Sequence, residues 1–391
     1  MVPVFWLSCA FVAYVYAGYP VLLILWARLA PRHAAAATTA RLVPPVSIVI
    51  AARNEAARLA ARLDNLLRLD YPSPRQIIVV SDGSTDDTLA VLSRYGRSID
   101  LIDRPAGGKA SALNAGVAVA KHDVLVFCDA RQTFKVDALR ELTAPFADPS
   151  IAAVTGELLL ECEGPETGAA TGRQRDTAAD DCAIAEGVGM YWRYEKALRR
   201  LESRVGSTLG ATGAVYALRR AAWRRLPDDT ILDDVLAPMR CVLDGSRVIF
   251  NERAVAYEHQ ALDTHTEMRR KVRTLAGNWQ ILALEPRLMI PWRNPVWLQY
   301  VSHKVGRLLV PYALVAAMAS SIALASRSIV YSGALILQCV LYLLGAYGAW
   351  SARRRQSLLA RTARLAYAFV VMNASAVAGL AAFSLRRRVW R

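Results

Sequence analysis

Residues 46–55 read VSIVIAARNE, a run of apolar residues that passes into polar ones, and the same design recurs twice downstream. QIIVVSDGSTDDT occupies residues 76–88, and DVLVFCDAR occupies residues 123–131. Between them lie segments with apolar residues at helical spacing, such as EAARLAARLDNLLRL. Nearly continuous Val and Ile runs are typical of parallel strands covered on both faces. Strands that alternate with helices therefore predict an α/β domain with a mixed, mostly parallel sheet.

Polar side chains follow the ends of all three strand-like runs. Ligands of parallel sheets bind beyond the carboxyl ends of the strands, so these side chains are candidates for a binding crevice. They are Arg53, Asn54, Glu55, Asp82 and Asp129.

The segment DGSTDDT also fits the start of a helix. Ser84 or Thr85 can cap the helix that follows, with the next two aspartates in its first turn. We favour this capping role for residues 84–87. Asp82 precedes the cap and faces the crevice, which favours ligand binding there.

Four long runs without a charged side chain flank this domain. About 20 apolar residues span a bilayer, so each run predicts a transmembrane helix. A cleaved signal peptide is disfavoured, because the first run is too long and nothing basic precedes it. A channel or transporter is also disfavoured, because such proteins carry charged residues inside their spans. The runs are Val4–Ala27, Leu308–Ala325, Ile329–Trp350 and Leu365–Leu385.

The composition indicates which kinds of partner and which compartment suit the protein. The chain has 391 residues and a formal net charge of +15, and a basic excess in a membrane protein usually lies on the cytoplasmic side. Nucleic-acid binding would require a basic stripe with stacking aromatics or a known reader fold, and the sequence shows neither. The six cysteines form no CxxC pair, which disfavours zinc and disulfides and fits a reducing compartment.

Two later motifs add candidate residues. LGATGAVYALRR, residues 209–220, has glycines in quick succession, which lets the backbone approach a ligand closely. ILDDVLAPMR, residues 231–240, places Asp233 and Asp234 at the start of a helical pattern. The two acids either complement the helix dipole or take part in chemistry.

Taken together, these motifs resemble those of membrane-bound family 2 glycosyltransferases, which include cellulose, chitin, hyaluronan and poly-N-acetylglucosamine synthases. VSIVIAARNE, VVSDGSTDDT, GGKASALNAG, VLVFCDARQ, GATGAVYALRR, LDDV and RRKVRTLAGN occur in the family's order over about residues 46–280. The resemblance implies a Rossmann-like GT-A fold, a nucleotide-sugar donor, usually UDP-linked, and Mg²⁺ or Mn²⁺. It also implies direct attack by the acceptor, which inverts the anomeric centre.

The resemblance assigns roles residue by residue. It implies that Asp234 is the general base, with Asp233 beside it, and that Asp82 accepts a hydrogen bond from the nucleotide base. Donor binding is assigned to Ala51, Arg53, Glu55, Asp82, Lys109, Asp129 and Arg131. Acceptor binding is assigned to Gly210, Ala211, Thr212, Gly213, Arg270 and Arg273.

The metal motif departs from the family's DxD pattern, because it reads DAR. Asp129 is expected to hold the ion through the donor diphosphate, whereas a cation stands in the second position. Arg131 either contacts the donor phosphates as a planar donor or pairs with Asp137 or Glu141. His259 follows a later strand and is either a further metal ligand or a structural residue.

The second departure is at the family's QxxRW motif, which here reads RKVRT over residues 270–274. The missing tryptophan removes a stacking face and puts processive polymerisation in doubt. We predict an inverting glycosyltransferase that moves a sugar to a saccharide or lipid-linked acceptor in cell-surface polysaccharide synthesis. One alternative loads a single sugar onto a polyprenyl phosphate, which would not need GATGA, LDD or RxxRT. Another is a non-catalytic nucleotide-sugar-binding membrane protein, which the retained Asp234 disfavours.

We expect a multi-pass protein of the plasma (inner) membrane whose catalytic domain is cytoplasmic, because nucleotide sugars are. Five arginines in residues 351–364 agree with a cytoplasmic loop, whereas the basic tail falls outside, against the positive-inside rule. Homo-oligomerisation stays open. The expected parts are a transmembrane helix (1–30), a GT-A domain (41–280), an interfacial segment (281–306) and three transmembrane helices (307–391).

Overall fold

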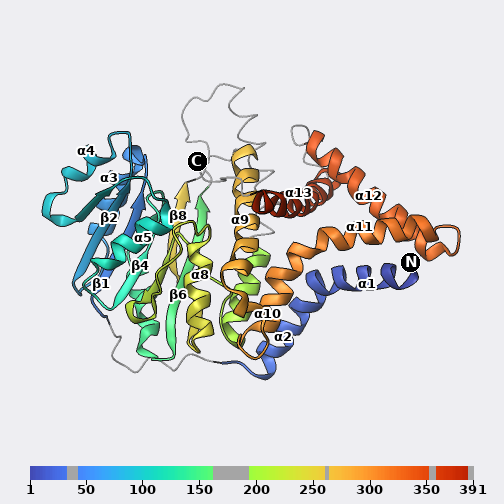
Figure 1. The fold of residues 1–391 in the computed structure, drawn as a ribbon, viewed down its shortest axis with the longest axis horizontal. Helices are drawn as coiled ribbons and strands as arrows, with labels where there is room; N and C mark the ends of the chain where they lie inside the picture. The colour runs from blue at the N-terminus through green and yellow to red at the C-terminus, as the bar shows by residue number, and fades with distance from the viewer. Residues whose placement is uncertain (33–42, 162–192, 260–263, 352–357, 386–391) are drawn as a thin grey trace.

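The computed structural model describes residues 1–32, 43–161, 193–259, 264–351 and 358–385. Within these residues, eight strands form one sheet in the order β3-β2-β1-β4-β7-β6-β8-β5. Figure 1 shows the sheet and its covering helices at the left and the long apolar helices at the right.

Four strands form the parallel half of the sheet. β1 lies between β2 and β4, and β3 pairs with β2, all in parallel. The four strands therefore end at one edge, where the sequence places the candidate polar residues. They are β1 (Val46–Ala52), β2 (Arg75–Asp82), β3 (Asp100–Arg104) and β4 (Val124–Phe127).

The other half of the sheet mixes strand directions. β7 runs antiparallel to both β4 and β6, β8 runs parallel to β6, and β5 runs antiparallel to β8. The predicted mixed, mostly parallel sheet is thus confirmed. These strands are β5 (Thr133–Phe134), β6 (Ile151–Glu161), β7 (Tyr216–Arg219) and β8 (Arg247–His259).

Helices cover both faces of the sheet, as the continuous apolar runs require. One buried cluster joins alternate strand residues to the helices α3 and α6, and a second joins the intervening residues to α5 and α8. The helices are α3 (Ala56–Leu67), α5 (Lys109–Ala118), α6 (Ala138–Thr143) and α8 (Asp233–Leu243). Short 3-10 turns are η2 (Gly96–Ser98), η3 (Ala144–Ala147) and η4 (Arg220–Ala222).

The turn after β2 differs from the predicted helix cap. The helix α4 (Thr88–Ser93) begins later, with Asp87 at its N-cap position. Ser84 Oγ instead accepts a hydrogen bond from the backbone N–H of Asn54, at 3.2 Å. Asp86 accepts one from Ala56 N at 3.2 Å. These side chains tie the end of β2 to the turn after β1, which sequence spacing within one turn does not reveal.

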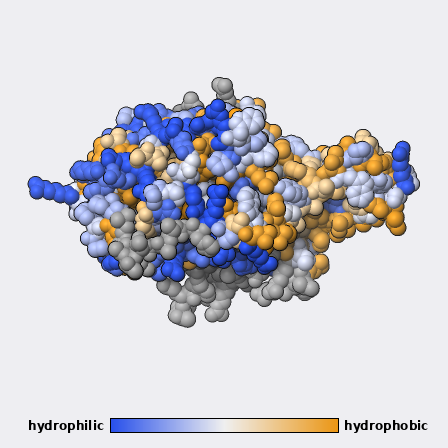
Figure 2. All heavy atoms as spheres, turned by 90° about the horizontal axis from the view of Figure 1, so that it is seen from below, coloured by the Kyte–Doolittle hydropathy of each residue, from blue (hydrophilic) through white to orange (hydrophobic). Residues whose placement is uncertain are grey.

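Four helical segments are long and apolar enough to cross a membrane, which confirms the predicted number among the described residues. The first joins α1 (Val2–Ala13), the π-helical η1 (Tyr14–Gly18) and α2 (Tyr19–Leu29). The others are α10 to α11 within Trp297–Leu324, α12 (Ile329–Ser351) and α13 (Leu358–Ser384). Figure 2 shows apolar surface concentrated on the projecting part at the right. Exposed apolar side chains on these helices include Trp6, Leu7, Val315, Ile336, Leu337 and Leu343.

The second candidate span starts at Trp297, well before the charge-free run at Leu308. It consists of α10 (Trp297–Gln299), the π-helical η6 (Tyr300–Val305) and α11 (Gly306–Leu324). Its first part is packed inside the protein, because Tyr300, Ser302 and His303 are buried. Upstream lie α9 (Thr264–Leu284) and η5 (Pro286–Met289).

The last span, α13, packs directly on α9 (Figure 1). A Cβ atom at Gly379 would lie 2.9 Å from the backbone nitrogen of Ala276 and 3.0 Å from Leu275 Cβ. Glycine at this position therefore allows the two helices to approach closely.

We expect Gly379→Ala to lower the melting temperature of the protein in detergent. The added methyl group meets backbone, which cannot move cheaply, and overpacking costs about 1–3 kcal/mol. Gly333→Ala in α12 is the matched control, because a Cβ added there would have nothing within 4 Å. Equal melting temperatures for the two variants would show that α13 does not pack on α9 in this way.

Candidate functional site

Lys109, the first residue of α5, lies between two carboxylates that are far apart in the sequence. Its Nζ is 2.9 Å from Asp129 Oδ1 and 3.4 Å from Asp233 Oδ1. Asp129 follows β4, and Asp233 is the first residue of α8. One ammonium group therefore joins the strand-end edge of the sheet to the amino end of α8.

The charges of this cluster shift one another's pKa values. Burial lowers the pKa of Lys109, but Asp129, Asp233 and Asp234 outweigh it and raise the pKa above its ordinary value. Burial raises the pKa of Asp129, but Lys109, with Arg131 and Arg273, outweighs it and holds that pKa below its ordinary value. The Lys109–Asp129 pair is therefore ionised at neutral pH.

Asp234 has the opposite shift. Burial, followed by the charge of Asp233, raises its pKa to about 6, against the opposing effect of Lys109. A carboxyl group with this pKa is ionised at pH 7 and takes up a proton readily. Beside it, Asp233 Oδ2 and the Tyr216 hydroxyl are buried and have no hydrogen-bond partner among the described residues.

The glycine-rich loop of residues 210–213 is fixed to the start of α8. Gly213 N donates a hydrogen bond to Asp234 Oδ2 at 3.0 Å, and Ala211 N donates to the backbone oxygen of Asp234 at 2.7 Å. Gly210 has a φ of +129°, and a Cβ there would lie 3.1 Å from Val235. The backbone at this position therefore favours glycine.

Thr212, in the same loop, makes hydrogen bonds with two other segments of the chain. Its N–H donates to Thr155 Oγ1 at 2.8 Å. Its hydroxyl accepts a hydrogen bond from Arg199, which lies on the helical segment 193–205. All four residues assigned to acceptor binding in this loop thus lie beside Asp234.

Asp82 holds the loop that leads into Lys109. Its two carboxylate oxygens accept backbone hydrogen bonds from Gly107 N at 2.7 Å and Gly108 N at 2.8 Å. Gly108 has a φ of +92°, so the turn favours glycine. A carboxylate oxygen can accept more than one hydrogen bond, so these contacts are compatible with the predicted hydrogen bond from a nucleotide base, which stays a prediction.

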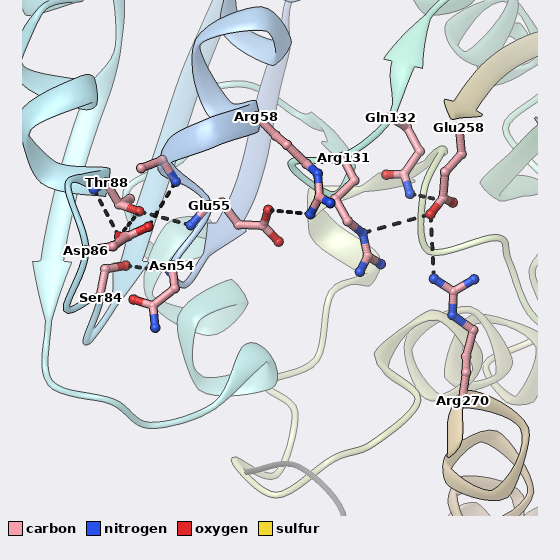
Figure 3. A network of polar contacts seen from close by, with 11 residues as sticks. Asn54, Glu55, Arg58, Ser84, Asp86, Thr88, Arg131, Gln132, Glu258 and Arg270 are labelled. Carbon is pink, nitrogen blue, oxygen red and sulfur yellow. Dashed lines mark hydrogen bonds and ion pairs between the residues drawn. The ribbon is translucent and has the colours of Figure 1, made fainter. Parts of the chain in front are cut away.

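The other candidates from β1 lie at the same edge. Ala51 is in the strand, and Arg53 follows it as an exposed residue. Glu55 is the N-cap residue of α3, and its carboxylate is 3.6 Å from Arg58 NH1. Figure 3 shows the ion pair between Glu55 and Arg58.

Arg131 pairs with Glu258 rather than with Asp137 or Glu141, so the predicted salt-bridge partners are wrong. Its Nε lies 3.9 Å from Glu258 Oε1. Asp137 pairs with Lys135, and Glu141 accepts a hydrogen bond from Asn251. The actual partner comes from the end of β8, which pairs with the strand that follows Arg131.

Glu258 also contacts Arg270 of α9, as Figure 3 shows. Its Oε1 is 3.6 Å from Arg270 NH2, and its Oε2 accepts a 2.9 Å hydrogen bond from Gln132. Arg131 itself makes no hydrogen bond in the described part of the chain, and its side chain is 40% exposed. Its N–H donors therefore stay available to a ligand.

The residues predicted to bind a metal supply only part of the ligands that an ion needs. No three His, Cys, Asp or Glu side chains suited to a metal occur together in the described ranges. The His259 backbone ends β8, but its side chain lies outside the described part. Asp129 is one available carboxylate, and Mg²⁺ often binds through one carboxylate together with substrate phosphates and water. The residues therefore fit a site that the donor completes.

Glu258, Arg199 and Lys304 are site residues that the sequence alone does not indicate. Glu258 directly precedes His259, yet nothing local marks it as a partner of Arg131. Lys304 lies close enough to lower the pKa of Asp234, although it comes from the membrane-helix side of the chain. Only the tertiary structure brings these residues to the site.

Comparison with known proteins agrees with this geometry. Residues 47–203 match the family model described as Glycosyl transferase family 2. A beta-monoglucosyldiacylglycerol synthase of Synechocystis sp. is 34% identical over 118 residues, which are 28% of this chain and 25% of that protein. A poly-beta-1,6-N-acetyl-D-glucosamine synthase of Staphylococcus epidermidis is 31% identical over 118 residues, 29% of this chain and 28% of that one. The matches thus span about a quarter of each relative.

The fold as a whole is similar to a mannosyltransferase from Pyrobaculum calidifontis, solved in complex with GDP-Man and Mn²⁺. The two chains superpose with a TM-score of 0.69 over 98% of this chain and 100% of the other, at 21% identity. The GT-A-like fold with four apolar helices is therefore shown.

We expect Lys109→Met to lower the melting temperature more at pH 7.5 than at pH 5. Without the ammonium, Asp129, Asp233 and Asp234 repel one another when ionised, which destabilises the folded state near neutral pH. Protonation at pH 5 then relieves the repulsion, and the deficit shrinks. Lys121→Met is the control, because Lys121 is 72% exposed and 3.9 Å from its partner Asp100. A deficit independent of pH would contradict the charge argument.

Proposed function

We propose, from the glycosyl transferase family 2 domain that this chain carries, that the cluster around Lys109 performs sugar transfer with inversion. The donor is a nucleotide sugar, and a UDP-linked sugar is the expected class. The observation that supports this most directly is the Lys109 bridge. It joins Asp129, on the expected donor side, to Asp233 beside the expected base Asp234.

The proposed reaction is a single displacement. The acceptor oxygen attacks the anomeric carbon and forms the new C–O bond. The bond from that carbon to the diphosphate oxygen breaks, and the electron pair leaves with the nucleotide. Asp234 takes the hydroxyl proton, which its pKa of about 6 favours near neutral pH. No covalent enzyme intermediate is needed.

On the donor side, Lys109, Arg131 and Arg273 supply positive charge around Asp129. Preorganised charge at a leaving diphosphate is usually the largest catalytic contribution. Mg²⁺ or Mn²⁺, when bound at Asp129, would add charge neutralisation at the same oxygens. The mannosyltransferase of similar fold was solved with Mn²⁺, which supports a divalent ion.

The acceptor is a saccharide or a lipid-linked saccharide. Relatives named as a polysaccharide synthase and a glycolipid synthase support synthesis of one of these products. Nucleotide-sugar donors are cytoplasmic. The domain of about residues 41–280 therefore lies on the cytoplasmic face of the plasma membrane, with the four candidate spans before and after it in the chain. Transfer to a polyprenyl phosphate is the second candidate. It would need neither the loop of residues 210–213 nor the acid at Asp234, which are joined here by the hydrogen bond from Gly213 N.

We expect Asp234→Asn to reduce transfer by about 10²–10⁴-fold, the usual contribution of general-base catalysis. Donor binding should persist. In the unmodified protein, kcat/KM should fall as the pH drops through about 6, because the base becomes protonated. The measurement is release of free nucleotide from a panel of UDP- and GDP-linked sugars, with and without metal. A variant with near-normal turnover would exclude Asp234 as the base.

We expect Arg131→Gln to weaken donor binding about tenfold, because a hydrogen bond to a charged group contributes about 1.5–3 kcal/mol. Its melting temperature should change little, since the contact with Glu258 is 3.9 Å long and Glu258 also contacts Arg270 and Gln132. Arg220→Gln is the matched control. Arg220 is 43% exposed and pairs with Asp123 at the opposite end of β4. Unchanged affinity with a lowered melting temperature would make Arg131 structural.

A further inference from the structure

The helical segment 193–205 is attached to the sheet through one of its faces. Positions 196 and 200 are one turn apart and therefore lie on the same face of the helix. Lys196 pairs with Glu157 of β6, and Arg200 pairs with Glu252 of β8. Two ion pairs to neighbouring strands thus fix the segment to the catalytic domain.

A different face of the same segment is attached to the candidate spans. Glu202 is buried, and its Oε1 accepts a 2.8 Å hydrogen bond from the Tyr19 hydroxyl of α2. The same oxygen lies 2.6 Å from His303 Nδ1 of η6. Glu195, two turns earlier on this face, pairs with Arg307 of α11. The segment therefore joins the first and second spans to the sheet.

Arg199 of this segment reaches the glycine-rich loop. Its guanidinium donates a hydrogen bond to Thr212 Oγ1. The N–H of Thr212 donates to Thr155 Oγ1 at 2.8 Å, and the next N–H along the chain, that of Gly213, donates to Asp234 Oδ2 at 3.0 Å. Arg199 thus contacts the residue directly before the one that hydrogen-bonds the expected base.

The hydrogen bond from Gly213 affects the base in two ways. A hydrogen bond to a carboxylate stabilises its ionised form and lowers its pKa. The same contact fixes the direction of Asp234 Oδ2, and a general base works only within hydrogen-bond reach of the proton that it takes. A glycine-rich backbone has high conformational entropy, so contacts from outside the loop, such as that of Arg199, restrict its movement.

We propose that Arg199 is a positioning residue of the transferase. Its hydrogen bond to Thr212 holds the glycine-rich loop, and the loop orients the carboxylate of Asp234 toward the acceptor hydroxyl. This inference rests on the proposed function and adds a residue that acts through the loop rather than on either substrate. Because the helix of Arg199 is also fixed to the spans, their packing takes part in shaping the acceptor side of the site.

The test compares Arg199→Leu with the unmodified full-length protein in detergent micelles. Donors are UDP- and GDP-linked sugars, acceptors are diacylglycerol and an oligosaccharide of β-1,6-linked N-acetylglucosamine, and nucleotide release is measured. At saturating acceptor we expect kcat to fall about tenfold, as for loss of a charge-assisted hydrogen bond, with unchanged donor affinity. The acidic limb of the pH profile, near pH 6 in the unmodified protein, should move to higher pH, because the ionised carboxylate is less stabilised.

Arg200→Leu is the matched control. Arg200 is the next residue of the same helix, is 48% exposed and pairs with Glu252 rather than with the loop. We expect it to keep kcat and the position of the acidic limb. An equal loss in Arg200→Leu would reduce the effect to destabilisation of the helix and overturn the proposal. Arg199→Lys, which keeps a charged donor, should restore part of kcat.

Thr212→Val separates the hydrogen bond from the charge, because it removes the acceptor oxygen and keeps the guanidinium. It should move the acidic limb in the same direction as Arg199→Leu, and it tests the proposal even where Arg199→Leu does not fold. The double variant should lose no more kcat than either single variant, since both remove one contact. Additive losses, or an acidic limb that stays in place, would overturn the proposal and leave the transferase function intact. Absence of nucleotide release from every donor by the unmodified protein would instead reject the proposed function itself.

Discussion

The ammonium of Lys109 is the interaction on which the rest of the site depends. Without it, Asp129, Asp233 and Asp234 would place three carboxylates close together in a partly buried space, and at least one would have to be protonated. With it, Asp129 stays ionised while Asp234 keeps a pKa of about 6. The same bridge sets the distance between the strand-end edge and α8. One side chain therefore determines both the charge balance and the geometry of the site. Asp82 in turn positions Lys109, because its carboxylate accepts hydrogen bonds from Gly107 and Gly108 in the loop before it.

Much of this arrangement could be predicted from the sequence, because its causes are local. The run of residues 46–52 is apolar at nearly every position. Such a run indicates a parallel strand that is buried on both faces, whatever segments lie next to it. The polar residue that follows such a run must then lie at the ligand-binding edge. Apolar length alone likewise predicts the four candidate spans. Asp82 and Asp129 could be placed at the same edge in this way, because β1, β2 and β4 run in parallel. Lys109 is assigned to the donor site only through the family resemblance.

What could not be predicted depends on contacts between distant segments. Sequence spacing suggests that Arg131 pairs with an acid six or ten residues away, yet the partner comes from β8, 127 positions later in the chain. The cause is the pairing of β5 with β8, in which Thr133 lies opposite Tyr257. Lys304 could not be placed for a similar reason. Composition shows a cation near a membrane helix, and only the tertiary structure brings Lys304 near enough to Asp234 to lower the pKa of that carboxyl group.

The pairing of β5 with β8 also explains why an arginine occupies the second position of the metal motif. An aspartate at position 131 would come close to Glu258, whose side chain is 7% exposed. Two carboxylates in such a place cannot both ionise without a large penalty, so a buried acid at Glu258 favours a cation at position 131. Glu258 is further balanced by Arg270 and hydrogen-bonded by Gln132. The second acid near this position is therefore Glu258 of β8, and Arg131 occupies the position in the motif itself. Asp129 therefore remains the carboxylate proposed to hold an ion, and Arg131 adds fixed positive charge that acts on it.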